Sequence, residues 1–157
     1  MGNTPEYFCN YPFLRGERRP CMQKQSDLKK FLYTDECPET SDLNWLIAST
    51  DSLTVGEYQL SPGSHFAPAD VHGGDEIYYV MRGEVTMFQP SSGQVMQISQ
   101  GEGILMPKGC PHIGYNFGSN EARMLYVVAP KMWDDDGPPV EYTGTLKTYK
   151  YEERGDK

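Results

Sequence analysis

The chain has 157 residues, enough for one domain that buries a real hydrophobic core. Its 22 acidic and 14 basic residues give a formal net charge of −8, which argues against nucleic-acid and anionic-membrane partners. No run approaches the roughly 20 apolar residues of a membrane span, and the first residues lack a basic-then-apolar signal. We therefore expect a soluble, cytoplasmic protein.

Residues 1–43 read as an irregular N-terminal extension with one short helix. The helix is expected over Ser26–Leu32, with Ser26 as its N-cap, because Leu28 and Phe31 share a helical face with Leu32. The four cysteines match no paired zinc-binding spacing; they are Cys9, Cys21, Cys37 and Cys110. Since no secretory signal is present, we expect free thiols.

From residue 44 to residue 130 the chain changes to short apolar runs separated by turns that contain Gly or Pro. Such spacing is typical of an all-β sandwich, barrel or jelly roll. The expected strands span residues 45–48, 53–60, 76–81, 84–89, 95–98, 103–106, 111–116 and 123–128. In the tail, residues 131–157, we expect one edge strand between Val140 and Tyr151.

Metal-ligating side chains stand at the starts of two of these strands. Asp70 and His72 precede the strand that carries Glu76 and Tyr78, and His112 lies in a later one. Because side chains alternate along a strand, Asp70 and His72 point the same way, as do Glu76 and Tyr78. Two imidazoles and one carboxylate with open coordination positions form the facial triad that suits a non-haem divalent metal.

The region around His112 resembles the second motif of the cupin family. That motif reads Gly, five residues, Pro-x-Gly, two residues, His, three residues, Asn. It is matched throughout by Gly101, Pro107, Gly109, His112 and Asn116.

The region around His72 resembles the second half of the family's first motif. His72, Glu76 and Gly83 match it, whereas Gly63 lies one residue too far upstream. Asp70 stands where the family has its first His. The motifs cover residues 63–116, and the strand pattern extends the likeness to about residues 44–130.

The resemblance implies a double-stranded β-helix, the cupin jelly-roll barrel, with one divalent transition metal (Fe, Mn, Ni or Zn) in its mouth. His72, Glu76 and His112 would be the ligands. For Asp70 four roles stay open: a fourth ligand, an acceptor that orients an imidazole, a base facing the substrate, or a solvated loop residue.

Two classes of function follow from this resemblance. The first is a metal-dependent enzyme, an oxygenase or an isomerase, epimerase or lyase, acting on a small oxygen-rich metabolite with Asp70 or Tyr78 transferring protons. The alternative is a non-catalytic module that binds a sugar or another metabolite. The family likeness also predicts a homodimer, for which the aromatic segment Tyr7–Leu14 offers contacts unless it folds across its own barrel.

Overall fold

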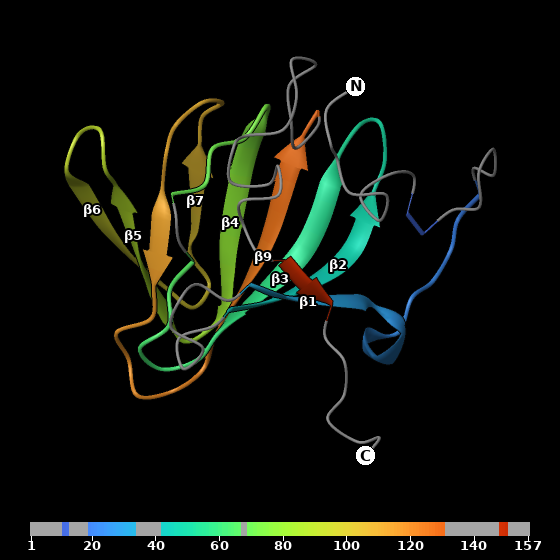
Figure 1. The fold of residues 1–157 in the computed structure, drawn as a ribbon, viewed down its shortest axis with the longest axis horizontal. Helices are drawn as coiled ribbons and strands as arrows, with labels where there is room; N and C mark the ends of the chain where they lie inside the picture. Colours follow the sequence, from blue (N-terminus) through green and yellow to red (C-terminus); the bar gives the residue numbers. More distant parts are fainter. Residues whose placement is uncertain (1–10, 13–18, 34–41, 67–68, 131–147, 151–157) are drawn as a thin grey trace.

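The computed structural model of the protein describes residues 11–12, 19–33, 42–66, 69–130 and 148–150, and these form two antiparallel sheets (Figure 1). The larger sheet has the strand order β10 (Thr148–Lys150), β1 (Lys29–Tyr33), β2 (Asp42–Ser49), β3 (Thr54–Leu60), β9 (Ala122–Ala129), β4 (Asp75–Arg82) and β7 (Gly103–Met106). The smaller sheet has the order β6 (Gln94–Ser99), β5 (Glu84–Gln89) and β8 (Ile113–Tyr115).

The chain alternates between the two sheets. It leaves the larger sheet after β4, returns at β7, leaves again for β8 and returns at β9. This winding is that of a double-stranded β-helix, so the predicted all-β jelly-roll class is confirmed. Each of the predicted barrel strands coincides with one of the strands β2 to β9.

A segment between β3 and β4 extends the smaller sheet beyond β8. The amide of Phe66 donates to the carbonyl of Gly114 at 3.2 Å. Further along, the amide of Asp70 donates to the carbonyl of His112 at 2.8 Å, and the amide of His112 donates back to the carbonyl of Asp70 at 3.0 Å. This reciprocal pair lies just outside β8 and fixes the backbone of Asp70 opposite that of His112.

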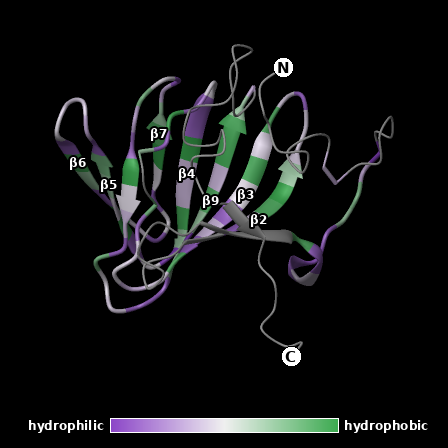
Figure 2. Ribbon diagram, in the orientation of Figure 1, coloured by the Kyte–Doolittle hydropathy of each residue, from purple (hydrophilic) through white to green (hydrophobic). Residues whose placement is uncertain are grey.

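Alternating burial determines which side chains face the interior. In β4 the inward residues are Glu76, Tyr78 and Val80, and β3 buries every second residue in the same way. Figure 2 shows the hydrophobic bands that result on the strands of the larger sheet. Both sheets contribute to one core, which consists of Leu46, Tyr58, Leu60, Phe66, Tyr78, Val80, Val85, Met87, Ile98, Met106, Ala122, Met124, Tyr126 and Val128. Each fully buried aliphatic side chain contributes about 1.5–3 kcal/mol.

Two glycines make room for aromatic rings in this core. A Cβ at Gly56 would lie 2.5 Å from the hydroxyl oxygen of Tyr126 on the neighbouring strand. A Cβ at Gly114 would overlap the ring of Phe66 and lie 3.0 Å from the sulfur of Met87. The absence of a side chain at these positions therefore lets an aromatic cluster fill the barrel.

The predicted helix over Ser26–Leu32 is wrong. The structure has a short 3-10 turn, η2 (Gln25–Asp27), and then strand β1, which pairs with β2 in the register Phe31 to Asn44. A helix this short is marginal on its own, whereas pairing with β2 satisfies the backbone of β1 along its length.

The predicted tail strand is found in part. Strand β10 lies within the predicted range Val140–Tyr151 and pairs with β1 at the edge of the larger sheet, while residues 140–147 and 151 fall outside the described residues. Of the Tyr7–Leu14 segment, only residues 11 and 12 are described. Cys21 and Cys110 are free thiols, and Cys9 and Cys37 fall outside the described residues. Among the described residues, no helix has the length and apolarity needed to cross a membrane.

Candidate metal centre

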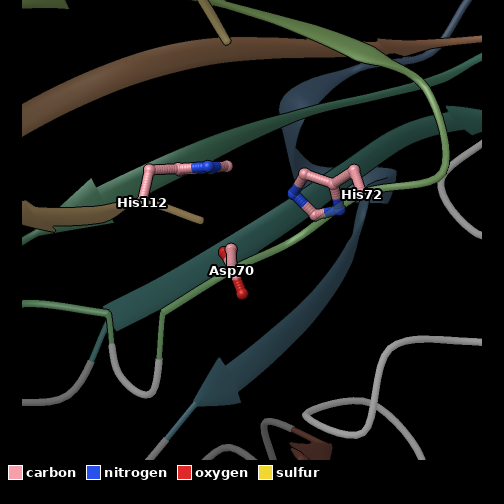
Figure 3. Close-up of side chains that lie close together, drawn as sticks. All are labelled: Asp70, His72 and His112. Carbon is pink, nitrogen blue, oxygen red and sulfur yellow. The ribbon is translucent and has the colours of Figure 1, made fainter. Parts of the chain in front are cut away.

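Three parts of the chain meet at one end of the barrel interior. The loop before β4 carries Asp70 and His72, β4 carries Glu76 and Tyr78, and the residue just before β8 is His112. All five side chains are buried. Figure 3 shows Asp70, His72 and His112 projecting into the same space.

Backbone contacts hold this arrangement before any side chain is considered. Asp70 and His112 form the reciprocal pair described above, which places their side chains on the same face. The amide of Gly109 donates to the carbonyl of His72 at 3.2 Å and ties the His72 loop to the turn that precedes His112. Gly109 has a φ of +73°, a conformation that residues with a Cβ rarely adopt.

The two imidazoles converge on one carboxylate oxygen. The Nε2 atom of His72 lies 3.0 Å from Oε2 of Glu76, and the Nε2 atom of His112 lies 2.9 Å from the same oxygen. The ligand atoms of Asp70, His72 and His112 all lie within 4.8 Å of one another. Asp70 and His72 are 4% exposed and Glu76 and His112 are 1% exposed, so the cluster is shielded from solvent.

These distances fit a metal ion. Neighbouring ligand atoms of an octahedral ion with bonds of about 2.1 Å are separated by roughly 3.0 Å, which is the separation between Glu76 Oε2 and each imidazole nitrogen. In the part of the chain that the structure describes, no hydrogen-bond donor reaches the buried Oε1 of Glu76. A buried charged oxygen without a donor is costly, and a cation would compensate it. The donor set therefore suits a divalent metal.

His112 is oriented by groups around it. Its Nδ1 lies 2.8 Å from the carbonyl oxygen of Cys110, and a carbonyl can only accept, so Nδ1 carries the hydrogen. In the neutral ring the lone pair is then on Nε2, the atom that faces Glu76. The hydroxyl of Tyr78 lies 3.1 Å from this Nε2. The ring is thus set in the tautomer that a metal ligand needs.

The ionisable groups of the cluster shift one another's pKa values. Burial alone would raise the pKa of Glu76, but the charge of His72 and the hydrogen bonds from His112 and His72 outweigh it and lower the pKa from 4.5 to about 2. Burial likewise opposes the charged form of His112, yet the hydrogen bond and charge of Glu76, with the charge of Asp70, raise its pKa above 6.5. Without a metal, His112 readily takes up a proton.

The structure thus brings together every candidate site residue that the sequence predicted. For Asp70 it removes one alternative, because a side chain that is 4% exposed is not a solvated loop residue. Two further contacts of His112 were not predicted from the sequence. The carbonyl of Cys110, rather than its thiol, contacts His112, and the ring of Phe66 packs edge-on against His112 with centroids 6.1 Å apart. A backbone carbonyl leaves no mark in a side-chain pattern, so only coordinates could reveal it.

Comparison with known proteins identifies the barrel. Residues 56–128 match the sequence model of the cupin domain. A search of curated proteins returned no match. The fold is similar to that of the EutQ protein of Clostridium difficile, with 24% identity over 64% of this chain and 78% of that one and a TM-score of 0.54.

Two further solved structures share the fold. An uncharacterised conserved protein with a double-stranded β-helix domain from Klebsiella pneumoniae is 22% identical over 71% of this chain and 84% of that one, with a TM-score of 0.53. A cupin superfamily protein from Desulfitobacterium hafniense is 17% identical over 59% of this chain and 78% of that one, with a TM-score of 0.51. Residues 56–128 of this chain, which carry the motifs at His72, Glu76 and His112, thus match a cupin domain, and the three solved structures show the same fold.

Proposed function

We propose that the protein is a metal-dependent enzyme that acts on a small oxygen-rich metabolite at the cluster of His72, Glu76 and His112, at one end of the barrel interior. His72, Glu76 and His112 would hold one divalent transition ion, with Fe, Mn, Ni and Zn all compatible with two nitrogen ligands and a carboxylate. The observation that carries the proposal is the approach of two imidazole nitrogens to a single buried carboxylate oxygen, at 3.0 and 2.9 Å.

The chain's own residues supply binding, orientation and proton transfer. Cys110 and Glu76 orient His112, while the rings of Phe66 and Tyr78 pack beside it and keep water from the back of the site. A bound ion would supply Lewis acidity toward a substrate hydroxyl or carbonyl, and iron would add oxygenase chemistry. The hydroxyl of Tyr78, 3.1 Å from Nε2 of His112, would donate or accept a proton at its oxygen.

Asp70 is the second candidate for proton transfer. Its carboxylate is buried in the same space as the two imidazoles, and its backbone is fixed by the pair with His112. These contacts support Asp70 as a general base, a role that requires its carboxylate to lie within hydrogen-bond reach of the substrate.

Metal titration of the chelator-treated protein tests the proposal. We expect about one equivalent of Mn(II), Fe(II), Ni(II) or Zn(II) to bind, and we expect His72→Asn and His112→Asn each to weaken binding at least about 100-fold, as loss of a ligand should exceed loss of a supporting residue. His65→Asn is the matched control, because His65 stacks on Tyr115 outside the cluster.

Equal binding by all three variants would show that the ion sits elsewhere. A protein that binds none of the four ions would leave the ligand-binding module as the better description. The titration thus separates the two classes of function before a substrate is known.

A further inference from the structure

The centre carries two carboxylates, and this bears on what it can bind. Asp70 and Glu76 both lie at the cluster, with 4% and 1% exposure. Carboxyl groups bind metals in the deprotonated form and imidazoles bind as neutral rings. A divalent ion with these four residues would therefore have a formal charge of zero, whereas Glu76 alone with the two imidazoles would leave a charge of +1.

Within the described ranges, no buried side chain supplies a positive charge to replace the one that Asp70 cancels. Among the described residues, the buried polar and charged side chains include no Lys and no Arg; they are Asn44, Ser49, Thr54, Ser64, Asp70, His72, Glu76, His112 and Asn116. Sites for carboxylate or phosphate substrates commonly use Arg or Lys to pair with the anion. The net charge of −8 also repels anions at long range.

The other buried polar side chains of the described residues are neutral. Ser49 and Thr54 face inward on the two strands beyond β9, and their hydroxyl oxygens are 3.0 Å apart. In the same sheet, at a greater distance from Glu76 along the strands, the hydroxyl of Tyr126 donates to the amide oxygen of Asn44 at 3.1 Å. The neutral group that lies at the cluster itself is the hydroxyl of Tyr78, 3.1 Å from Nε2 of His112, and such a group suits a hydroxyl or carbonyl oxygen.

We infer that Asp70 makes the metal centre electrically neutral and so selects an uncharged, hydroxyl- or carbonyl-bearing substrate over a carboxylate or phosphate. The inference rests on the proposed function, since it needs a bound ion. It assigns Asp70 a role in specificity that neither burial nor the motif spacing supplies. A unit charge within about 5 Å of the ligand position changes anion affinity by at least about tenfold at the effective dielectric of such sites.

Two matched probes test this role without any turnover assay. Glycolate and glycolamide offer the same hydroxyl and carbonyl oxygens and differ in charge. Each is titrated into the full-length protein loaded with Co(II), whose visible absorption reports ligand binding at the ion. We expect the native protein to bind glycolamide at least as tightly as glycolate, and Asp70→Asn to shift the preference toward glycolate at least about tenfold. Asp70→Glu, which keeps the charge, should retain the native preference.

The outcomes separate the two proposals. A native protein that binds Co(II) but prefers glycolate more than about tenfold overturns the role of Asp70 and leaves the metal site standing, and this holds even if Asp70→Asn does not fold. An unchanged preference in Asp70→Asn overturns it as well. A native protein that takes up no Co(II) removes the metal site and the role of Asp70 with it.

Discussion

Glu76 and Val80 lie on the same inward face of β4, and neither side chain is more than 1% exposed. Around Val80 the interior is apolar, since its partner across the strand pair is Met124. Around Glu76 the neighbours are His72 and His112. Strand alternation therefore determines which side chains are buried, and it does so at both ends of β4. The metal-binding character of one end comes from the segments that bring His72 and His112 to Glu76.

Among changes at the two ends of β4, removing the charge of Glu76 should have the largest effect, and that effect should be on metal affinity. Glu76→Gln keeps the shape of the side chain but loses a charged ligand, so we expect metal affinity to fall at least about 100-fold while the metal-free protein stays folded. Calorimetric titration with Mn(II) measures it. Asp75→Asn is the control, since Asp75 lies next to Glu76 on the outward face and accepts a hydrogen bond from the amide of Lys108 at 2.9 Å, which Asn can also accept. Native affinity in Glu76→Gln would exclude this carboxylate as a ligand.

Truncation of a side chain at the apolar end should have the opposite result, because it should lower stability and leave metal affinity unchanged. Leu60 lies at the Val80 end, because it pairs with Ala122, two residues before the Met124 that pairs with Val80. Leu60→Ala removes a fully buried side chain, and we expect the free energy of unfolding to drop by about 2–5 kcal/mol with metal affinity unchanged within about threefold. Urea denaturation of the metal-free protein gives the first quantity and titration the second. Met22→Ala, at a residue that is 95% exposed, should change neither. A loss of metal affinity as large as that of Glu76→Gln would mean that the two ends are not independent.

Adding a methyl group between the two ends should lower the free energy of unfolding by a smaller amount. Gly114→Ala drives a methyl group into the ring of Phe66, which also packs against His112, so we expect a loss of about 1–3 kcal/mol in unfolding free energy. Adding Phe66→Leu should recover part of that loss, because the two substitutions share one contact. Strictly additive losses in the double variant would show that the ring does not cause the strain.

The pH dependence of the metal-free protein should report the charges at the Glu76 end. The pKa of Glu76 is lowered from 4.5 to about 2, so its contribution to stability is full above pH 4.5 and is lost as the pH falls toward 2. The pKa of His112 is raised above 6.5, so its contribution is full below pH 6.5 and is lost as the pH rises through the raised value.

Stability of the metal-free protein should therefore peak between pH 4.5 and pH 6.5, fall by up to about 3 kcal/mol as the pH drops toward 2, and fall also as the pH rises above 6.5. Thermal melts in the presence of a chelator measure it. The metal-loaded protein should keep its stability above pH 6.5, because the ion takes the place of the proton. A flat profile in His112→Asn on the alkaline side is the expected control, and an unchanged decline there would assign the titration to another group.

Much of the fold could be predicted because its signals are local. Alternation along β4 gives both the inward Glu76 and Tyr78 and the outward Asp75, and turn residues mark where each strand ends. The spacing of His72, Glu76 and His112 predicted the residues of the site in the same way. The strand β1 could not be predicted, because its conformation depends on pairing with a separate strand, β2, and its apolar spacing also fits a helix.

The details of the site were beyond the sequence for a similar reason. The sequence placed Asp70 beside His72 but left its role open, because its burial comes from a backbone pair with His112, distant in the chain. The tautomer of His112 is set by the backbone carbonyl of Cys110, and the cysteine side chain plays no part in this contact. Contacts between distant backbone groups decide both features.

The most direct test is a crystal structure of the protein soaked with Mn(II), with anomalous scattering used to locate the ion. We expect a single strong peak bonded to Nε2 of His72, Nε2 of His112 and a carboxylate oxygen of Glu76. A peak bound at other residues, or a well-ordered site with no peak at saturating Mn(II), would contradict the convergence of these three groups on a shared ion.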